Sequence, residues 1–450
     1  MSDNNIDQQQ IDVRQLINEL GVEELCRTAE EYFGRIENWD YHLALPFTGI
    51  DETPEMLIHF AQLLQGLRPL PGMTVLDFGA GSCWTSRFLT QLGYQVIALD
   101  VSTTALKIGQ ELFHRHPIFG NHAESVFLHF DGHRIDLPDE SVDRISCLNS
   151  FHHVPNQDEI LSEMARVLKQ GGIAGFSEPG PEHSKSAQSQ YEMRTHRVVE
   201  NDINVEQIWS AAQASGFTDI KLAVFNSMSF LLPLADFQNY LAAVEQPAPA
   251  IDNERKQENS SLLKRLLRFV GNRRPQDSTP AGLMPQQQAG AGAIYAEQTR
   301  AYIRDRRVFF LYKGELAAAD SRQRLGLQAK LEVNLASTKV AEGTPFLAQI
   351  KVTNSGSTIW LPISAPKGPV QLGVHLLAPD GTLVNLDYSR HRLMQGEGRP
   401  IQPGEILQLE TTVPSPAKGR HILAFDLVSE GITWFEMSGS QAVRVEVEVT

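Results

Sequence analysis

Residues Val75–Ser102 read "VLDFGAGSCWTSRFLTQLGYQVIALDVS". A short apolar run comes first, a glycine-containing turn and a helix-like segment follow, and a second apolar run ends at Asp100. This order is typical of a nucleotide-binding unit in a parallel sheet. A phosphate-binding loop is excluded because no Gly-Lys-Ser/Thr follows the glycines. A dinucleotide fingerprint fits poorly, because Trp84 stands where that motif requires a third small residue.

The alternation of apolar and helical segments continues beyond this unit. Short apolar runs separated by helical stretches predict a doubly wound α/β domain with a mostly parallel sheet, covered by helices on both faces. The expected strands are Val75–Phe78, Gln95–Leu99, Val126–Phe130, Arg144–Leu148, Gly172–Phe176, Ile220–Phe225 and Arg307–Tyr312, and the expected helices are Ser82–Leu92, Thr103–Phe113, Glu159–Leu168 and Val205–Ala214.

Two further segments interrupt or precede this pattern. Residues 1–70 repeat apolar side chains at spacings of three and four, which predicts helices. Residues 227–305 form an insert between the last two expected strands, with a basic amphipathic helix at Ser261–Val270 and a stretch rich in Gly, Pro and Gln at Gly271–Ala293. The basic helix either touches a membrane or an anionic ligand, or only packs its leucines and exposes its arginines. The stretch after it predicts a linker or a mobile lid.

The C-terminal segment, residues 328–450, consists of short alternating runs separated by turn residues. This spacing predicts an antiparallel β-sandwich, and a short helix after Lys313 is expected to lead into it. Trp360 and Trp434 have two interpretations. An exposed indole suits the apolar face of a sugar ring, whereas a buried indole belongs to the sandwich core.

The composition narrows the class of protein. A net charge of −15 over 450 residues argues against nucleic-acid binding, which needs a basic surface. No secretory signal is recognised at the start of the chain, and no apolar run approaches the roughly 20 residues of a membrane span. The three cysteines Cys26, Cys83 and Cys147 are far apart, which fits neither a disulfide framework nor a zinc cluster. We therefore expect a cytoplasmic protein with reduced thiols, no integral membrane segment and no metal site.

Acidic residues stand at the ends of three successive expected strands. Asp77 is close to the end of the first strand, Asp100 ends the second, and Asp131 follows the third and precedes Gly132. The carboxyl ends of parallel strands are where such folds bind ligands, and a carboxylate at the second strand can accept both ribose hydroxyls of an adenosyl group. Together with the glycine turn, these positions predict an adenosyl-binding site.

The motifs "VLDFGAGSCWTS", "VIALDVS", "FDGHRIDLPDESVDRISCLNSFHHVPN" and "EMARVLKQGGIAGFSEPG" occur in order within Val75–Gly180. This segment resembles the class I S-adenosylmethionine-dependent methyltransferases. The resemblance implies S-adenosylmethionine as the cofactor and a seven-stranded sheet whose last strand, at "RRVFFLYKG", is antiparallel. It further implies that Gly79, Ala80 and Gly81 face the methionine part, Asp77 helps orient its amino group, Asp100 binds ribose, Asp131 lies beside adenine, and Asn149 and Ser150 touch the sulfonium side. Val101 and Gly132, next to Asp100 and Asp131, are also expected to bind the cofactor.

Methyl transfer is an in-line displacement in which the protein mainly positions the two reactants, and a hydroxyl acceptor gains from a general base. The candidates are His152 and His153 in "SFHHVPN", Glu178 in "FSEPG", and His183. An imidazole is basic enough for this role at neutral pH. The alternative is that His152 or His153 only lines the cofactor cavity.

Two weaker resemblances suggest an acceptor. Residues 178–220 resemble methyltransferases encoded with bacterial surface-polysaccharide genes, and the tail, with "LVSEGITWFEMSGSQAVRVEVEV", is similar to the sugar-binding β-sandwich of O-antigen exporter ATPases. They imply O-methylation of a glycan or of a nucleotide- or lipid-linked sugar in surface polysaccharide biosynthesis, with peripheral association with a glycan-assembly complex. The alternatives are a small-molecule or lipid acceptor, and a cofactor-binding scaffold without catalysis. The expected domains are residues 1–70, part of the acceptor site or a lid, residues 71–315, the methyltransferase domain, and residues 328–450, the sandwich.

Overall fold

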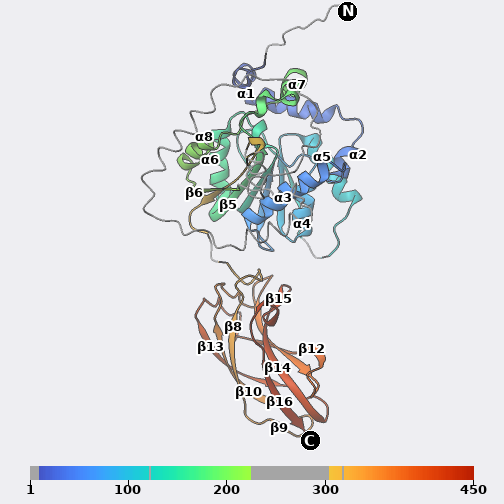
Figure 1. The fold of residues 1–450 in the computed structure, drawn as a ribbon, viewed down its shortest axis with the longest axis vertical. Helices are drawn as coiled ribbons and strands as arrows, with labels where there is room; N and C mark the ends of the chain where they lie inside the picture. The colour runs from blue at the N-terminus through green and yellow to red at the C-terminus, as the bar shows by residue number, and fades with distance from the viewer. Residues whose placement is uncertain (1–9, 121–122, 224–299, 301–303, 317–318) are drawn as a thin grey trace, which may run out of the picture. The chain divides into compact units, whose positions relative to one another are not determined.

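The computed structural model describes residues 10–120, 123–223, 300, 304–316 and 319–450. They form an α/β part, which ends with the strand at Arg306–Lys313, and an all-β part that follows it (Figure 1). The basic helix expected at Ser261–Val270 and the stretch Gly271–Ala293 lie outside the described residues. No helix of the described ranges is long and apolar enough to cross a membrane.

The α/β part is built on a seven-stranded sheet in the order β3-β2-β1-β4-β5-β7-β6. All neighbouring strands are parallel except β7, which is antiparallel to both β5 and β6. The predicted sheet, including its antiparallel member, is therefore confirmed. The strands are β1 Thr74–Phe78, β2 Gln95–Asp100, β3 Val126–His129, β4 Val142–Leu148, β5 Leu168–Pro179, β6 Asp219–Ala223 and β7 Arg306–Lys313.

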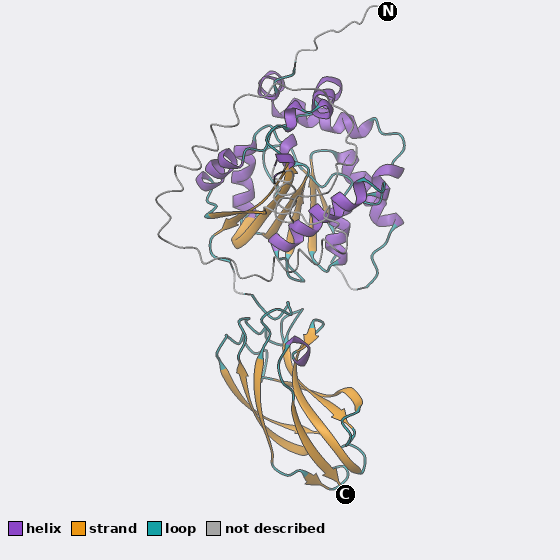
Figure 2. Ribbon diagram, in the orientation of Figure 1, coloured by secondary structure: helices purple, strands orange, loops and turns teal. Residues whose placement is uncertain are grey.

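Helices cover both faces of this sheet (Figure 2). Successive side chains of a strand point to opposite faces. Leu76 packs in a cluster with Ile160 and Met164 of α6, whereas its neighbour Val75 packs with Leu89 of α4. The helices are α1 Val13–Gly34, α2 Asp40–Ala44, α3 Glu52–Leu67, α4 Trp84–Gln91, α5 Thr103–Arg115, α6 Gln157–Val167, α7 Ala187–His196 and α8 Val205–Ala214, with short 3-10 turns η1 Phe151–His153 and η2 His183–Lys185.

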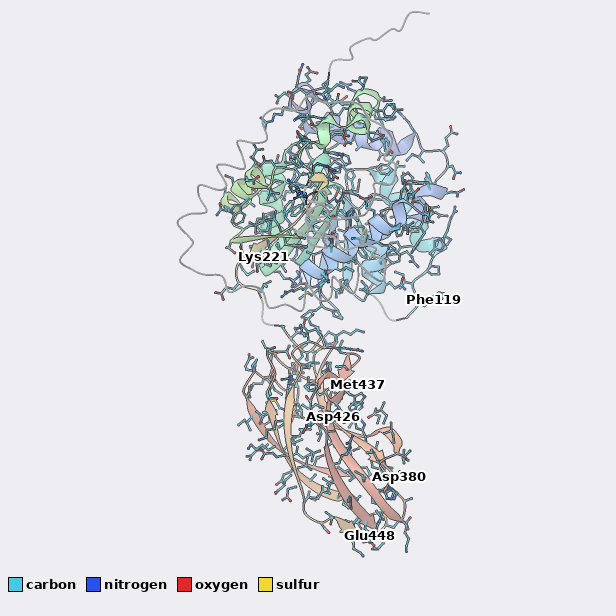
Figure 3. All side chains as sticks on the ribbon, in the orientation of Figure 1. Phe119, Lys221, Asp380, Asp426, Met437 and Glu448 are labelled. Carbon is cyan, nitrogen blue, oxygen red and sulfur yellow. The ribbon has the colours of Figure 1, made fainter. Side chains whose placement is uncertain are left out.

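The all-β part consists of two sheets, β13-β10-β8 and β12-β11-β14-β16-β9, the second extended by β15 on β14. One apolar cluster fills the space between them, with Ile350 and Phe346 from the first sheet and Phe425 from the second. Side chains such as Asp380 project from its surface (Figure 3). The strands are β8 Ala329–Leu335, β9 Lys339–Val340, β10 Phe346–Asn354, β11 Val370–Leu377, β12 Leu383–Arg392, β13 Ile406–Val413, β14 Gly419–Ser429, β15 Thr433–Trp434 and β16 Val443–Val449.

The two tryptophans of the all-β part differ in burial. Trp360 is fully buried in the core, as the packing interpretation requires. Trp434 is only partly buried, and its ring lies 4.5 Å from the guanidinium of Arg390. The core interpretation therefore holds for Trp360 and not for Trp434.

The short helix expected after Lys313 is wrong for the described residues 314–316 and 319–328, which form bends, turns and an isolated bridge. Gly314 has a positive φ, and the Asp320 carboxylate accepts hydrogen bonds from the backbone N–H and guanidinium of Arg322. Such a local side-chain contact offers the backbone an alternative to helical hydrogen bonds.

Candidate functional site

The turn after β1 brings the backbone close to the end of β4. Gly79 has a φ of 65°, and a Cβ on it would lie 2.3 Å from Cβ of Ser150, so only glycine fits at this position. Gly81 also has a positive φ, and its N–H donates to Oδ2 of Asp100 at 2.8 Å. Oδ1 of Asp100 accepts from the Ser102 N–H at 2.8 Å. The carboxylate at the end of β2 thus fixes the glycine turn.

Asp77 lies beneath this turn. Its Oδ2 accepts from the hydroxyls of Thr85 at 2.6 Å and Ser86 at 2.5 Å, which ties the end of β1 to the first turn of α4. Burial raises the pKa of Asp77 to about 6, against the opposing effect of these two hydroxyls. Asp77 does not line the cavity, and its contacts position α4 against β1. Its role in orienting the cofactor's amino group stays a prediction.

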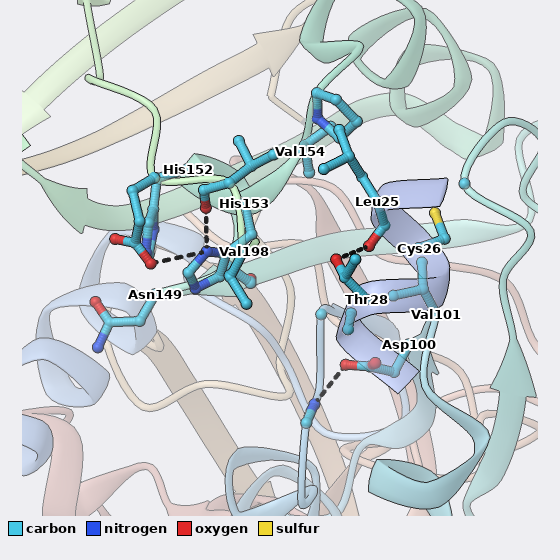
Figure 4. A pocket seen from close by; sticks show the side chains of 18 of the residues that line it. Leu25, Cys26, Thr28, Asp100, Val101, Asn149, His152, His153, Val154 and Val198 are labelled. Atoms are coloured by element: carbon cyan, nitrogen blue, oxygen red, sulfur yellow. Dashed lines mark hydrogen bonds and ion pairs between the residues drawn. The ribbon is translucent and has the colours of Figure 1, made fainter. Parts of the chain in front are cut away.

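A cavity of about 590 Å³ opens at the carboxyl ends of the parallel strands (Figure 4). This volume is within the range of small-molecule and cofactor sites. Asp131 and Ala80 are not in its wall. Asp131 is exposed, and its carboxylate accepts from the backbone N–H groups of His133 and Arg134, so it shapes the loop after β3. Its place beside adenine stays a prediction. The predicted cofactor-binding residues in the wall are Gly79, Gly81, Asp100, Val101, Gly132 and Asn149.

Helix α1 closes one side of the cavity with residues such as Leu25, Thr28 and Tyr32. Glu30, also on α1, fixes this helix to the residues that follow β2. Its carboxylate accepts from the Ser102 hydroxyl at 2.7 Å and from the N–H and hydroxyl of Thr104 at 3.1 and 2.6 Å. Burial opposes ionisation, but these donors lower the pKa of Glu30 to about 2. Glu30 was not predicted, because nothing in its local sequence pattern shows that it contacts residues about 70 positions later.

Glu178 is fully buried and does not line the cavity. Its Oε1 accepts from the N–H groups of Ser150 and Phe151 at 3.1 and 3.0 Å, and its Oε2 lies 2.6 Å from Nδ1 of His152. Strand β5 continues past Phe176, where we expected it to end, and Glu178 pairs within the sheet. The predicted role of Glu178 as a base that contacts the acceptor is therefore not supported, and its contacts make it a positioning residue for η1.

Both tandem histidines line the cavity, with fixed tautomers. Nδ1 of His152 donates to the Glu178 carboxylate, while burial, reinforced by neighbouring His153, lowers the pKa of His152 to about 4, so His152 is neutral at physiological pH. Nδ1 of His153 lies 2.7 Å from the carbonyl oxygen of Val199. Because a carbonyl only accepts, this nitrogen carries the proton, which leaves the lone pair of neutral His153 on Nε2.

Two further groups complete the cluster around η1. Glu200 is 5% exposed and lines the cavity. Its Oε2 lies 2.6 Å from Nε2 of His183, which was also a candidate base. Oε1 of Glu200 lies 3.5 Å from Nδ1 of His153. Glu200 was not predicted, because the loop that contains it has no periodic pattern or motif.

Residues 76–176 match a family described as a methyltransferase domain. Residues of this chain are 30% identical to a demethylmenaquinone methyltransferase of Streptomyces griseus over 127 residues, covering 28% of this chain and 51% of that protein. They are 32% identical to the ubiquinone/menaquinone biosynthesis C-methyltransferase UbiE of Shewanella pealeana over 116 residues, covering 24% and 45%. The chain spans about half the length of the curated relatives it matches.

Among solved structures, the chain is similar to phosphoethanolamine N-methyltransferase 2 of Haemonchus contortus in complex with S-adenosyl-L-methionine, with 18% identity, a TM-score of 0.36, and coverage of 68% of this chain and 60% of that one. The family match falls on the strands and loops that form the cavity floor. Residues 76–176 of this chain are therefore similar to a methyltransferase domain.

Proposed function

We propose that the whole protein is an S-adenosylmethionine-dependent methyltransferase that acts on a hydroxyl group bound between α1, η1 and residues 198–200. The observation that carries this proposal is the cavity itself. It combines a glycine turn that tolerates no side chain at Gly79, a carboxylate at Asp100, and histidine nitrogens in one enclosed space.

Different residues of the cavity wall could hold different parts of the cofactor. Each Asp100 oxygen accepts one backbone N–H and retains a lone pair for a ribose hydroxyl. Gly79 and Gly81 would hold the methionine part, and Val101 and Gly132 would border the adenine. The bound cofactor supplies an electrophilic methyl group on a positively charged sulfur. The remaining work of the chain is to align the acceptor, exclude water and remove one proton.

His153 is the base in this proposal. Its Nε2 has the free lone pair, and its side chain is 40% exposed, whereas the His152 side chain is 7% exposed. Bound S-adenosylmethionine would supply its methyl group to the acceptor oxygen and leave as the neutral thioether, and Nε2 of His153 would take the hydroxyl proton. His152, held neutral by burial, lines the cavity and supports His153, their ring centroids being 3.9 Å apart.

The walls favour a small, partly apolar acceptor. On the α1 side the wall is formed mostly by apolar and aromatic side chains, with Cys26 and Thr28 among them: Leu25, Cys26, Thr28, Ala29, Tyr32 and Phe33. The names of relatives in quinone biosynthesis agree with a small, partly apolar acceptor; they include both a C-methyltransferase and an O-methyltransferase, so they do not favour a hydroxyl over a carbon. A glycan or a nucleotide- or lipid-linked sugar in surface polysaccharide biosynthesis is the second candidate, and the partly exposed Trp434 on the sandwich supports it. A scaffold without catalysis is disfavoured because His153 retains a free Nε2 toward the cavity.

Transfer of a radiolabelled methyl group from S-adenosylmethionine tests this proposal. The panel contains phenols and reduced demethylquinones in one arm, and lipid-linked glycans and nucleotide sugars in the other. We expect labelling in the first arm, lost in His153→Gln and retained in Glu182→Gln, a change of an exposed carboxylate outside the cavity. Labelling of glycans alone would show that the acceptor is a glycan and not a phenol or quinone. Cofactor binding without any labelling in either arm would favour the scaffold.

A further inference from the structure

One oxygen of the Glu200 carboxylate is held by hydrogen bonds, and the other lies close to His153. Oε2 accepts from Nε2 of His183 at 2.6 Å and from the hydroxyl of Ser189 at 3.2 Å. Oε1 lies 3.5 Å from Nδ1 of His153. His153 and Glu200 both line the cavity. Nδ1 of His153 faces Glu200, and its Nε2 has no protein partner in the described contacts.

The backbone around Glu200 is fixed to η1. The Asn201 N–H donates to the carbonyl of His152 at 2.8 Å, and Nδ2 of Asn201 donates to the carbonyl of Val154 at 2.9 Å. On the other side of Glu200, the carbonyl of Val199 accepts from Nδ1 of His153. Hydrogen bonds on both sides therefore fix the backbone of Glu200 relative to His153.

We propose that Glu200 is the electrostatic and positioning partner of His153, and that His183 anchors it for this purpose. The proposal rests on the proposed function, because it concerns the proton that His153 takes from the acceptor. The neutral ring becomes an imidazolium when Nε2 receives that proton. A carboxylate on the Nδ1 side stabilises this cation and holds the ring in one orientation, which is the arrangement that general bases in other enzymes obtain from a third group.

Other charged groups also face His153, and they do not replace Glu200. Glu178 on β5 is taken up by η1 backbone N–H groups and His152, and Asp100 on β2 accepts from two backbone N–H groups. Burial alone would raise the pKa of Glu200, but His183, His153 and His152 more than offset it, so the pKa lies below its ordinary value. The remaining titratable or charged groups in the cavity wall are Cys26, Tyr32, His152, His183, Glu192 and Arg306.

The test is a comparison of the histidine ring signals by NMR at one pH, on the full chain saturated with S-adenosylhomocysteine, with His153 assigned from the signal missing in His153→Gln. We expect Glu200→Gln to move the His153 ring signal, because the ring loses the carboxylate 3.5 Å from its Nδ1. His183→Gln keeps the Glu200 carboxylate and removes its anchor, so it should move the signal in the same direction by less. Glu182→Gln is the control and should leave it unchanged.

Activity provides the second readout. For methyl transfer to the best phenol of the panel, kcat should fall about tenfold in Glu200→Gln, with an unchanged KM for S-adenosylmethionine. An unchanged His153 ring signal in both Glu200→Gln and His183→Gln overturns the proposal. So does a stoichiometric divalent cation in the isolated protein that Glu200→Gln releases, because the ligand atoms of His152, His153 and Glu200 lie within 4.8 Å of one another. If no cofactor binds, the proposed function fails, while the NMR comparison in free protein still decides whether the two side chains are in contact.

Discussion

Replacing Asp100 by asparagine should weaken cofactor binding strongly while leaving the fold intact. Each Asp100 oxygen already accepts one backbone N–H, from Gly81 or Ser102, at 2.8 Å. An amide keeps one of these acceptors and turns an NH2 group toward the other donor. The variant therefore loses one charged acceptor for the ribose and loosens the glycine turn. At about 1.5–3 kcal/mol for a hydrogen bond to a charged group, the combined loss is about 2–4 kcal/mol, or roughly 30- to 900-fold in Kd.

Isothermal titration with S-adenosylhomocysteine measures this effect directly. Wild type, Asp100→Asn and the control Asp136→Asn, a change of an exposed carboxylate, are compared at one pH and salt concentration. Circular dichroism melting shows whether Asp100→Asn remains folded. Affinity within twofold of wild type in a folded Asp100→Asn would refute the assignment of Asp100 to the ribose, and with it the orientation of the cofactor in the cavity.

Three other changes have expected outcomes. Glu30→Gln should lower the stability of the α/β part by about 1–2 kcal/mol at pH 7, a value discounted for partial exposure. The pKa of Glu30 is lower in the folded chain than in the unfolded chain. This stabilisation is therefore complete above the unfolded pKa of about 4.5 and is lost as the pH falls toward about 2. In urea denaturation, the stability difference between wild type and Glu30→Gln at pH 3 should be less than half of that at pH 7, and an equal difference would contradict the hydrogen bonds assigned to Glu30. Gly79→Ala should abolish S-adenosylhomocysteine binding, because the new Cβ would overlap Ser150. The control Gly93→Ala, where the new Cβ meets open space, should bind normally. Equal binding by the two variants would refute the close approach of Gly79 to Ser150. Trp360→Ala should destabilise the sandwich by about 3–5 kcal/mol in chemical denaturation with cofactor affinity within twofold, and a small loss would mean that Trp360 is not a core residue.

The sheet was predictable from the sequence because its strands alternate with amphipathic helices at a regular spacing. The positions of Asp100 and the glycine turn followed from the same pattern, since parallel strands bring their carboxyl ends to one edge. The antiparallel last strand came from the family resemblance and not from the apolar pattern, which does not encode strand direction.

The side-chain contacts of the site were less predictable. Asp77 and Glu178 were both expected to face a ligand, yet Asp77 binds two hydroxyls of α4 and Glu178 binds the backbone of η1. Whether a carboxylate at a strand end faces inward or toward the cavity depends on which donors lie beside it in space. Glu30 and Glu200 were missed for the same reason, because their partners are distant in the sequence.

The most direct test of the central claim is an isothermal titration of the wild-type chain with S-adenosylmethionine, paired with its thermal melting curve. We expect saturable heat with one site per chain, a Kd in the micromolar range, and a rise in melting temperature at saturating cofactor. No heat and no thermal shift would contradict the assignment of the cavity to this cofactor.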